Sequence, residues 1–252
     1  GHIDEGRDSG ELQVLAMAFV NESPNKVRGL RFFERLSPEI ATLPHYQRAV
    51  GLFHFNRGAL KPAEAALRLT IAESDDLLSY LALFETLRRR DRVAEIRPIG
   101  DQVDARALRG SPREKMGYAQ AWRDAGDGPS AMAFAYEVLM AEPDDANAAL
   151  GYFGMVMMDP RKRLIPRPTT VGIDTWVRFE SDQGDPVAFV IVAKDARPGA
   201  GIVTPAHPIV AKAMGLKAGD TFVVEGGVTG DHIWRVAEIK HKYLHALHDV
   251  ML

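Results

Sequence analysis

The sequence predicts an α+β protein with two domains, an all-helical one followed by a small antiparallel sheet with one helix. Three observations predict this division. Residue types recur every 34 positions through the first 158 residues, and apolar and polar residues alternate in strand-length runs from Ile173 onward. A proline- and arginine-rich stretch separates the two patterns. A period of this length indicates stacked helix pairs, and the alternation indicates half-buried strands.

The domain limits follow from these patterns. The predicted ranges are a disordered leader with a tag remnant at 1–10, a helical repeat domain at 11–158, a linker at 159–172, a sheet domain at 173–243 and the start of a truncated helix at 244–252. The linker places prolines around basic residues, a composition typical of semi-rigid spacers. Because the last helix has no cap or polar tail, we expect the native protein to continue beyond Leu252.

Composition excludes several classes of protein. With 252 residues of which 46% are hydrophobic, the chain can bury a substantial core. The net charge is −3, and residues 173–252 hold 8 Lys and Arg against 10 Asp and Glu, so direct nucleic-acid binding is not expected. There is no cysteine, which excludes disulfides and thiolate metal sites. No apolar run approaches the ~20 residues of a membrane helix. We expect a cytoplasmic protein with no cofactor and no membrane partner.

The helical domain repeats small residues at fixed places. Gly58 and Gly126 share one column of the 34-residue period, and Ala63 and Ala131 share another. The two best units contain Gly51, Leu52, Gly58, Ala63 and Leu67, and Ala119, Trp122, Gly126, Ala131 and Pro143. These units resemble the tetratricopeptide repeat, a helix–turn–helix module. Small residues let the paired helices approach closely, and glycine permits a turn with positive φ.

The third unit departs from the pattern. Arg97, Asp101 and Asp104 occupy columns that should be small or apolar, and Pro98 interrupts a helix through them. A local register shift is therefore expected, with the second helix at 98–108. A final helix at about 145–158 is apolar on several sides, which predicts that other residues cover it.

The resemblance to tetratricopeptide repeats implies a concave groove that binds a protein or peptide. The candidate groove residues are Tyr46, Arg57, Arg88, Arg89 and Arg90. Arginine suits the recognition of acidic partners or phosphates. The alternative is that the arginine run is an exposed helix end that Asp91 and Glu95 partly neutralise.

The stretch from His207 to Val224 has the pattern of a helix, a glycine stop, a tight turn and a strand. Pro208 suits a first helical turn, Gly215 can end the helix, and Gly219 and Asp220 belong to a turn. Other strands are predicted at 173–179, 186–194, 221–225 and 232–240, with a glycine-rich hairpin turn at 226–231.

This stretch resembles the C-terminal domain of the bacterial Gre transcript-cleavage factors. The matching residues are Pro208, Ile209, Ala211, Ala213, Gly215, Lys217, Gly219 and Asp220. The resemblance implies an FKBP-like sheet that docks on RNA polymerase through a loop, here His207, Pro208 and Lys212. The family's loop reads Asp-Ser-Pro, so His207 is expected to serve a different partner or to cap the helix. The family's coiled coil with acidic tip residues is absent, and transcript cleavage is not expected.

Other candidate sites have simpler interpretations. His241, His245 and His248 would share one face of the last helix, a spacing that can hold a metal ion, but no carboxylate accompanies them and a solvated face is the preferred interpretation. Asp75-Asp76 and Asp144-Asp145 precede helices, where aspartate is a favoured cap.

Catalytic motifs are missing from the sequence. No phosphate loop, dinucleotide fingerprint or nucleophile elbow is present. Four aromatic residues are expected in the core of the sheet, although an FKBP-like fold would also allow a prolyl-isomerase pocket: Trp176, Phe189, Phe222 and Trp234.

The sequence therefore predicts a non-enzymatic adaptor. Its repeat groove would hold a protein or peptide, and its Gre-like domain would dock on a large partner, with RNA polymerase the first candidate. The alternative rests on a second resemblance, to bacterial conflict-system proteins that combine both modules with a PIN ribonuclease. In that case the chain is the regulatory part of a toxin, and the nuclease lies outside these residues.

Overall fold

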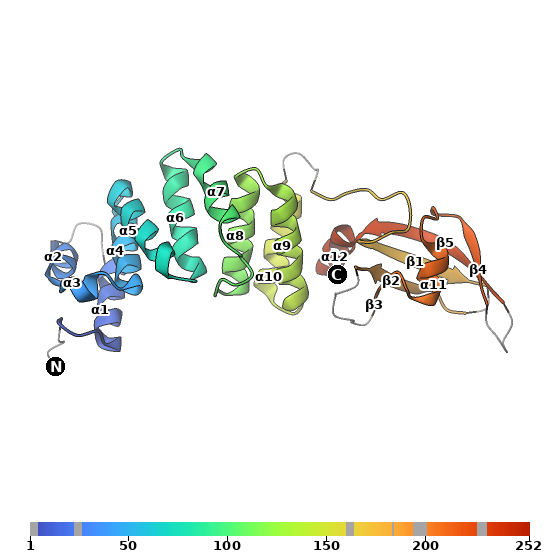
Figure 1. The fold of residues 1–252 in the computed structure, drawn as a ribbon, viewed down its shortest axis with the longest axis horizontal. Helices are drawn as coiled ribbons and strands as arrows, with labels where there is room; N and C mark the ends of the chain where they lie inside the picture. The colour runs from blue at the N-terminus through green and yellow to red at the C-terminus, as the bar shows by residue number, and fades with distance from the viewer. Residues whose placement is uncertain (1–4, 23–26, 160–163, 183, 194–200, 226–230) are drawn as a thin grey trace. The chain divides into compact units, whose positions relative to one another are not determined.

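The computed structural model describes residues 5–22, 27–159, 164–182, 184–193, 201–225 and 231–252. The chain divides into two compact units, Gly1–Met155 and Val156–Leu252, which we call the helical unit and the sheet unit (Figure 1). Together the described residues form an α+β fold. Among them no helix combines the length and the apolar character that crossing a membrane requires.

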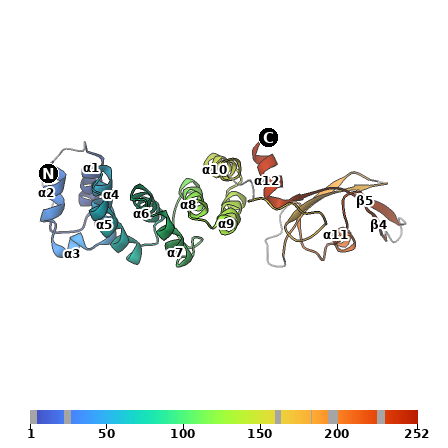
Figure 2. The ribbon, with the colours of Figure 1, turned by 90° about the horizontal axis from the view of Figure 1, so that it is seen from above.

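The helical unit consists of consecutive helix pairs. The first helices of the pairs are α1 (Gly10–Asn21), α4 (Pro44–Asn56), α6 (Leu77–Arg89), α8 (Pro112–Asp124) and α10 (Ala146–Met157). Their partners are α2 (Val27–Arg35), α5 (Leu60–Glu73), the 3-10 turn η1 (Val93–Glu95) with α7 (Ile96–Asp101), and α9 (Gly128–Ala141); a short α3 (Pro38–Ala41) precedes α4. Figure 2 shows α6, α8 and α10 in one row and α7 and α9 in another.

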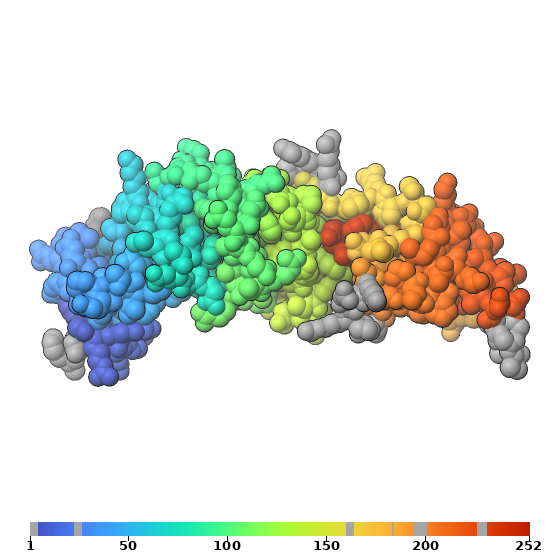
Figure 3. Space-filling view, viewed as in Figure 1, coloured from blue at the N-terminus to red at the C-terminus, as the bar shows by residue number. Residues whose placement is uncertain are grey.

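The helices keep the spacing that the sequence predicts. Successive first helices begin 33 to 35 residues apart, and so do their partners when η1 is counted with α7. Neighbouring helices pack against one another along the chain, α4 on α5 and α8 on α9 most extensively, and the space-filling view shows no open gap between them (Figure 3). The repeat period is thus present in the structure, while membership of the tetratricopeptide family stays a prediction.

Local residue chemistry sets the helix ends. Asp76 caps α6 by accepting a 3.2 Å hydrogen bond from the Ser79 amide, and Asp145 accepts 2.8 Å bonds from the first amides of α10. The capping predicted for these two aspartates is confirmed. In the turns between paired helices, Gly58 has φ 72° and Gly126 has φ 103°, which confirms the conformation that glycine was expected to supply.

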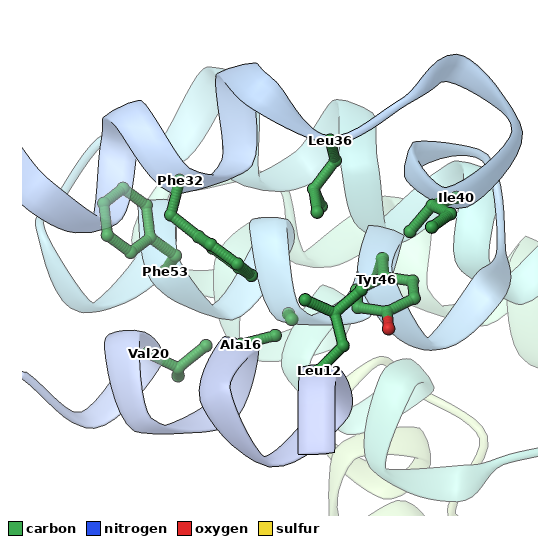
Figure 4. Packing of buried hydrophobic residues seen from close by; sticks show 9 residues of the cluster. Leu12, Ala16, Val20, Phe32, Leu36, Ile40, Tyr46 and Phe53 are labelled. Carbon is green, nitrogen blue, oxygen red and sulfur yellow. The ribbon is translucent and has the colours of Figure 1, made fainter. Parts of the chain in front are cut away.

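The core at the start of the helical unit joins α1, α2, α3 and α4 (Figure 4). Its buried residues are Leu12, Ala16, Val20, Phe32, Leu36, Ile40, Tyr46, Ala49 and Phe53. They recur at three- and four-residue intervals, so each helix turns one apolar stripe inward. Complete burial of one such aliphatic or aromatic side chain contributes roughly 1.5–3 kcal/mol.

The third pair differs from the sequence prediction. The helix expected over 98–108 ends at Asp101, and residues 102–110 form turns and an extended segment. The Arg109 amide donates to the Asp75 carbonyl at 2.8 Å, and the Leu77 amide donates to the Arg109 carbonyl at 2.9 Å. This pairing requires an extended backbone at Arg109. The chain must therefore leave the helix before Leu108 to reach it. Leu108 is nevertheless buried, as the predicted apolar stripe required.

The sheet unit holds β1 (Thr175–Ser181), β2 (Val187–Ile191), β3 (Ile202–Val203), α11 (Pro208–Ala213), β4 (Thr221–Val224), β5 (His232–His241) and α12 (Lys242–Val250). The strand order is β3-β2-β1-β5-β4. β1 pairs with β2 and β5 in antiparallel fashion, but β2 and β3 are parallel. The expected purely antiparallel sheet is therefore corrected to a mixed one. The predicted turn at 226–231 lies, except for Asp231, outside the described residues.

One face of this sheet packs on α11. Val177, Phe179 and Val236 of the sheet meet Val210 and Ala213 of the helix. Phe189, Phe222 and Trp234 pack around this core, whereas Trp176 points to the opposite face and stacks on His245 at 4.8 Å between ring centroids. Val171 is buried in the same core, so the sheet unit begins inside the segment predicted to be a linker.

Candidate functional site

The predicted docking loop lies at the start of α11. Pro208 and Lys212 are exposed and stand four residues apart, so they share one face of the helix. The His207 ring is half-buried, with its centroid 4.5 Å from that of Phe189. His207 precedes the helix but makes no capping hydrogen bond through its side chain, so the expectation that it caps α11 in this way is wrong.

The turn after α11 explains why several residues of the predicted signature are present. Gly215 has φ 82°, and its amide donates to the Val171 carbonyl at 2.9 Å. The Asp220 carboxylate accepts from the Lys217 amide at 2.8 Å, and its carbonyl accepts from the Val236 amide at 2.9 Å. These residues hold the turn between α11 and β4. These roles are structural. The exposed side chains of this stretch include those of Pro208, Ala211, Lys212 and Lys217.

Tyr46, predicted to line a groove, is packed in the core and also lines a cavity of the helical unit. Its side chain is 0% exposed, and its hydroxyl donates to the Asp8 carboxylate at 3.1 Å. Burial raises the pKa of Tyr46 to about 12, and the bond to Asp8 acts in the same direction. The hydrogen bond from Gln13 lowers the pKa of the Asp8 carboxyl, and Tyr46 and His45 add to that effect.

The predicted arginines make contacts within the helical unit. Arg57 lies over the Phe53 ring, 3.4 Å from its centroid, and donates to the Phe53 carbonyl. Arg88 and Arg89 both bind Glu85, at 3.0 and 3.1 Å. Arg89 also lies over the Phe55 ring, and Arg90 donates to Glu64.

Glu64 is the centre of this arginine cluster. It is 6% exposed and also binds Arg92 at 2.8 Å and Arg68 at 2.8 Å. Arg68 and Arg92 in turn bind Glu95. The neutralising carboxylates are therefore Glu64, Glu85, Glu95 and Asp124, whereas the sequence suggested Asp91 and Glu95. We call Glu64, Arg68, Arg90, Arg92 and Glu95 the Glu64 network.

Two adjoining cavities lie elsewhere on the helical unit. The first, of about 580 Å³, is lined by Pro44, His45, Arg48, Thr70, Glu73, Ser74, Asp75, Asp76, Ser79, Arg109 and Gly110. The second, of about 600 Å³, is lined by Gly10, Gln13, Val14, Ala16, Met17, Ala18, Asn21, His45, Tyr46, Arg48 and Ala49. We call them the polar cavity and the apolar cavity. His45 and Arg48 of α4 line both, so the two cavities adjoin at these residues, and we call them together the groove.

Ion pairs shape the polar cavity. Arg48 binds Asp76 at 2.7 Å, and Arg109 binds Asp75 through two nitrogens at 2.6 and 2.8 Å. These hydrogen bonds from Arg109 lower the pKa of the Asp75 carboxyl. Among the described residues, the Nε atom of Arg48 is buried without a hydrogen-bond partner.

Of the residues predicted to line a groove, Tyr46 lines the apolar cavity. The other lining residues were not predicted, although the sequence contains a signal for some of them. Val14 and Arg48 are each the fifth residue of a first helix and stand 34 residues apart. Because the two residues occupy the same position of the 34-residue period, the period predicts that they lie on the same side of neighbouring helices. Glu73 and Arg109 lie in different elements, and only the fold brings them to one cavity.

Of the three histidines near the C-terminus, His245 and His248 lie on α12, but His241 lies before the helix. His241 precedes the helix and accepts a 3.3 Å hydrogen bond from the Tyr243 amide, while His245 lies 3.3 Å from Asp249. Burial lowers the pKa of both His241 and His245. Within the described part of the chain, no three His, Asp or Glu side chains are arranged to hold a metal ion.

Comparisons with known proteins give structural likeness only. No family model and no curated protein matches the sequence. A GreA/GreB transcription elongation factor from Nitrosomonas europaea matches 42% of this chain and 92% of its own, at 19% identity and a TM-score of 0.26. Gfh1 of Thermus aquaticus matches 50% of this chain and 95% of its own, at 17% identity and a TM-score of 0.24.

A third structural neighbour is similar. The GreA factor homolog Gfh1 of Thermus thermophilus matches 51% of this chain and 94% of its own, at 15% identity and a TM-score of 0.24. All three neighbours are Gre factors, and each aligns with about half of this chain. Identities and TM-scores this low transfer neither a binding site nor a function to this chain.

Proposed function

We propose that this protein is a non-catalytic adaptor, in which the helical unit binds a peptide segment of one protein and the sheet unit docks on a second, larger one. RNA polymerase is the first candidate for the larger partner. Docking on RNA polymerase would give the protein a role associated with transcription.

The groove on the helical unit is the observation that supports peptide binding best. Its two cavities have volumes of about 580 and 600 Å³, and each is within the range of small-ligand sites. They adjoin through His45 and Arg48 and so extend over α1, α4 and the start of α6. A long surface of this kind suits an extended chain better than a compact metabolite.

The sheet unit supports docking through one exposed helical face. Pro208 belongs to the Gre-like sequence motif and Lys212 lies within the same stretch. Both are exposed, and Gly215 and Asp220 hold the turn that follows. A rigid turn that presents a proline and a cation is suited to recognition, because little conformational entropy is lost on binding. RNA polymerase enters the proposal through the sequence resemblance of this motif to Gre factors.

A binding assay with core RNA polymerase tests the docking. The immobilised 252-residue chain is expected to retain the polymerase, and Lys212→Glu is expected to reduce the retained amount several-fold. Lys61→Glu on α5 makes the same charge change at an exposed residue of the helical unit and serves as the control. Equal retention by wild type and Lys212→Glu, or no retention at all, would rule out docking through this face.

A further inference from the structure

We propose that the groove of the helical unit selects a peptide in which a Lys or Arg side chain lies close to an aliphatic one. The cation would bind at Glu73 in the polar cavity, and the aliphatic side chain would cover Val14 in the apolar cavity. This inference rests on the proposed peptide-binding function and specifies the chemistry of the peptide.

The charges of the polar cavity favour a cation. Its lining contains three carboxylates, Glu73, Asp75 and Asp76, two guanidinium groups, and the ring of His45, which pairs with Asp8 at 3.2 Å. Both guanidinium groups are engaged, Arg48 with Asp76 and Arg109 with Asp75. Glu73 lies at the exposed end of α5 and makes no ion pair with the other described residues. An ammonium or guanidinium group from a ligand would complete the charge balance, whereas an anion would meet an uncompensated carboxylate.

The apolar cavity offers an unpartnered aliphatic surface beside these charges. Val14 is 71% exposed, and Ala18 is also exposed one helical turn further along α1. Met17 lies between them in the sequence and lines the same cavity. Residues three and four apart share one helix face, so the three side chains form one apolar strip. Covering this strip with an aliphatic side chain removes apolar surface from water.

The border between the cavities suits a peptide backbone. Arg48 lines both cavities, and its Nε atom is a buried donor without a partner among the described residues. An unsatisfied buried donor is unfavourable, and a ligand carbonyl would satisfy it only through a turn of the Arg48 side chain that keeps the ion pair with Asp76. In an extended chain neighbouring side chains point to opposite sides. A cation and an aliphatic residue two positions apart would therefore point into the groove together.

An array of random N-acetylated, C-amidated decapeptides tests the inference with the full 252-residue chain as the probe. Peptides that bind are expected to be enriched in Lys or Arg within three residues of Leu, Ile or Val. For the best such peptide, Glu73→Gln is expected to raise the Kd about fivefold, the upper range for one exposed ion pair. Glu142→Gln, at the exposed end of α9, is the matched control and is expected to leave the Kd unchanged.

A second pair of variants tests the apolar cavity. Val14→Ser is expected to raise the Kd about fivefold or more, as the loss of one buried aliphatic contact implies. Leu69→Ser changes an equally exposed aliphatic residue of α5 outside the groove and is expected to have no effect. Circular dichroism of each variant checks that the helical unit remains folded.

The outcomes separate this inference from the proposed function. Peptides that bind without preference for Lys or Arg, or whose Kd is unchanged by Glu73→Gln, would overturn the cationic specificity and leave peptide binding in place. If no peptide binds at concentrations up to about 1 mM, the weak limit of specific affinity, peptide binding and its specificity both fail.

Discussion

The helical unit has two regions rich in arginine, and they use the residue differently. In the Glu64 network, Arg68, Arg90 and Arg92 surround one carboxylate that is 6% exposed. In the polar cavity, Arg48 and Arg109 each hold an aspartate, and Glu73 remains exposed beside them. The first region neutralises a buried charge, and the second surrounds an open space.

This difference shows why a run of arginines is weak evidence for a binding site. The sequence prediction assigned partner binding to the dense run Arg88–Arg90, whereas the structure pairs that run with carboxylates of the same unit. Isolated arginines line the cavity. A charge is available to a partner when the fold leaves it unmatched, and this depends on residues distant in sequence.

The largest expected effect comes from the centre of the network. Glu64→Gln removes the charge that Arg90 and Arg92 share. Arg92 keeps its ion pair with Glu95, but the partly buried Arg90 loses its counterion among the described residues. We expect a loss of about 2–3 kcal/mol in the free energy of unfolding, measured by urea denaturation.

Glu85→Gln is the matched control for this prediction. Glu85 also binds two arginines, but its side chain and theirs are exposed. The expected loss is below about 0.5 kcal/mol. Similar losses in the two variants would contradict the distinction between a buried and an exposed carboxylate.

The next largest effect on stability is expected from two buried tyrosines of the helical unit. Tyr46 donates to Asp8, whereas the Tyr118 hydroxyl is buried with no hydrogen-bond partner among the described residues. Tyr46→Phe is expected to cost about 1 kcal/mol, and Tyr118→Phe is expected to be neutral or stabilising, because an unsatisfied polar group is removed. Thermal melts should give a lower melting temperature for Tyr46→Phe than for Tyr118→Phe. A lower value for Tyr118→Phe would contradict the prediction.

The pH dependence of Tyr46 follows from its raised pKa. Folding favours the neutral phenol, so its stabilisation is complete below the ordinary pKa of 10 and is lost as the pH rises toward about 12. Wild type should therefore lose more stability between pH 10 and pH 12 than Tyr46→Phe does. Parallel stability curves for the two proteins in this range would contradict the assignment.

The smallest effect is expected at Arg109. Its two-nitrogen pair with Asp75 has good geometry, but both side chains are exposed, and such pairs contribute little to stability. Arg109→Ala is expected to leave the melting temperature unchanged within error. A clear drop would show that this pair, and not the backbone bonds of residue 109, holds the extended segment after α7.

The sequence predicted most of the helical pairs because their signals are local. Gly58 and Gly126 have the positive φ that the turns need, and Asp76 and Asp145 cap the helices that follow them. The early end of α7 could not be predicted, since it depends on the pairing of Arg109 with residues before α6. β3 was missed for a related reason. It has two residues, and only its parallel pairing with β2 defines it.

The candidate groove was less predictable than the fold. Tyr46 was predicted as a groove residue; it lines the apolar cavity, and its side chain is also buried in the core. Its burial depends on α1 and on the contact with Asp8. Glu73 has no distinguishing sequence context, and its importance comes from the ion pairs that occupy Arg48 and Arg109.

The most direct test of peptide binding in the groove measures how variants of the two arginine-rich regions change the affinity for one peptide. The Kd of a fluorescein-labelled Lys-containing peptide from the array would be measured by anisotropy for wild type, Glu73→Gln and the double variant Arg88→Ala/Arg89→Ala. If the peptide's cation binds at Glu73, we expect about fivefold weaker binding for Glu73→Gln and unchanged binding for the double variant. Weaker binding by the arginine variant together with a wild-type Kd for Glu73→Gln would contradict binding at Glu73.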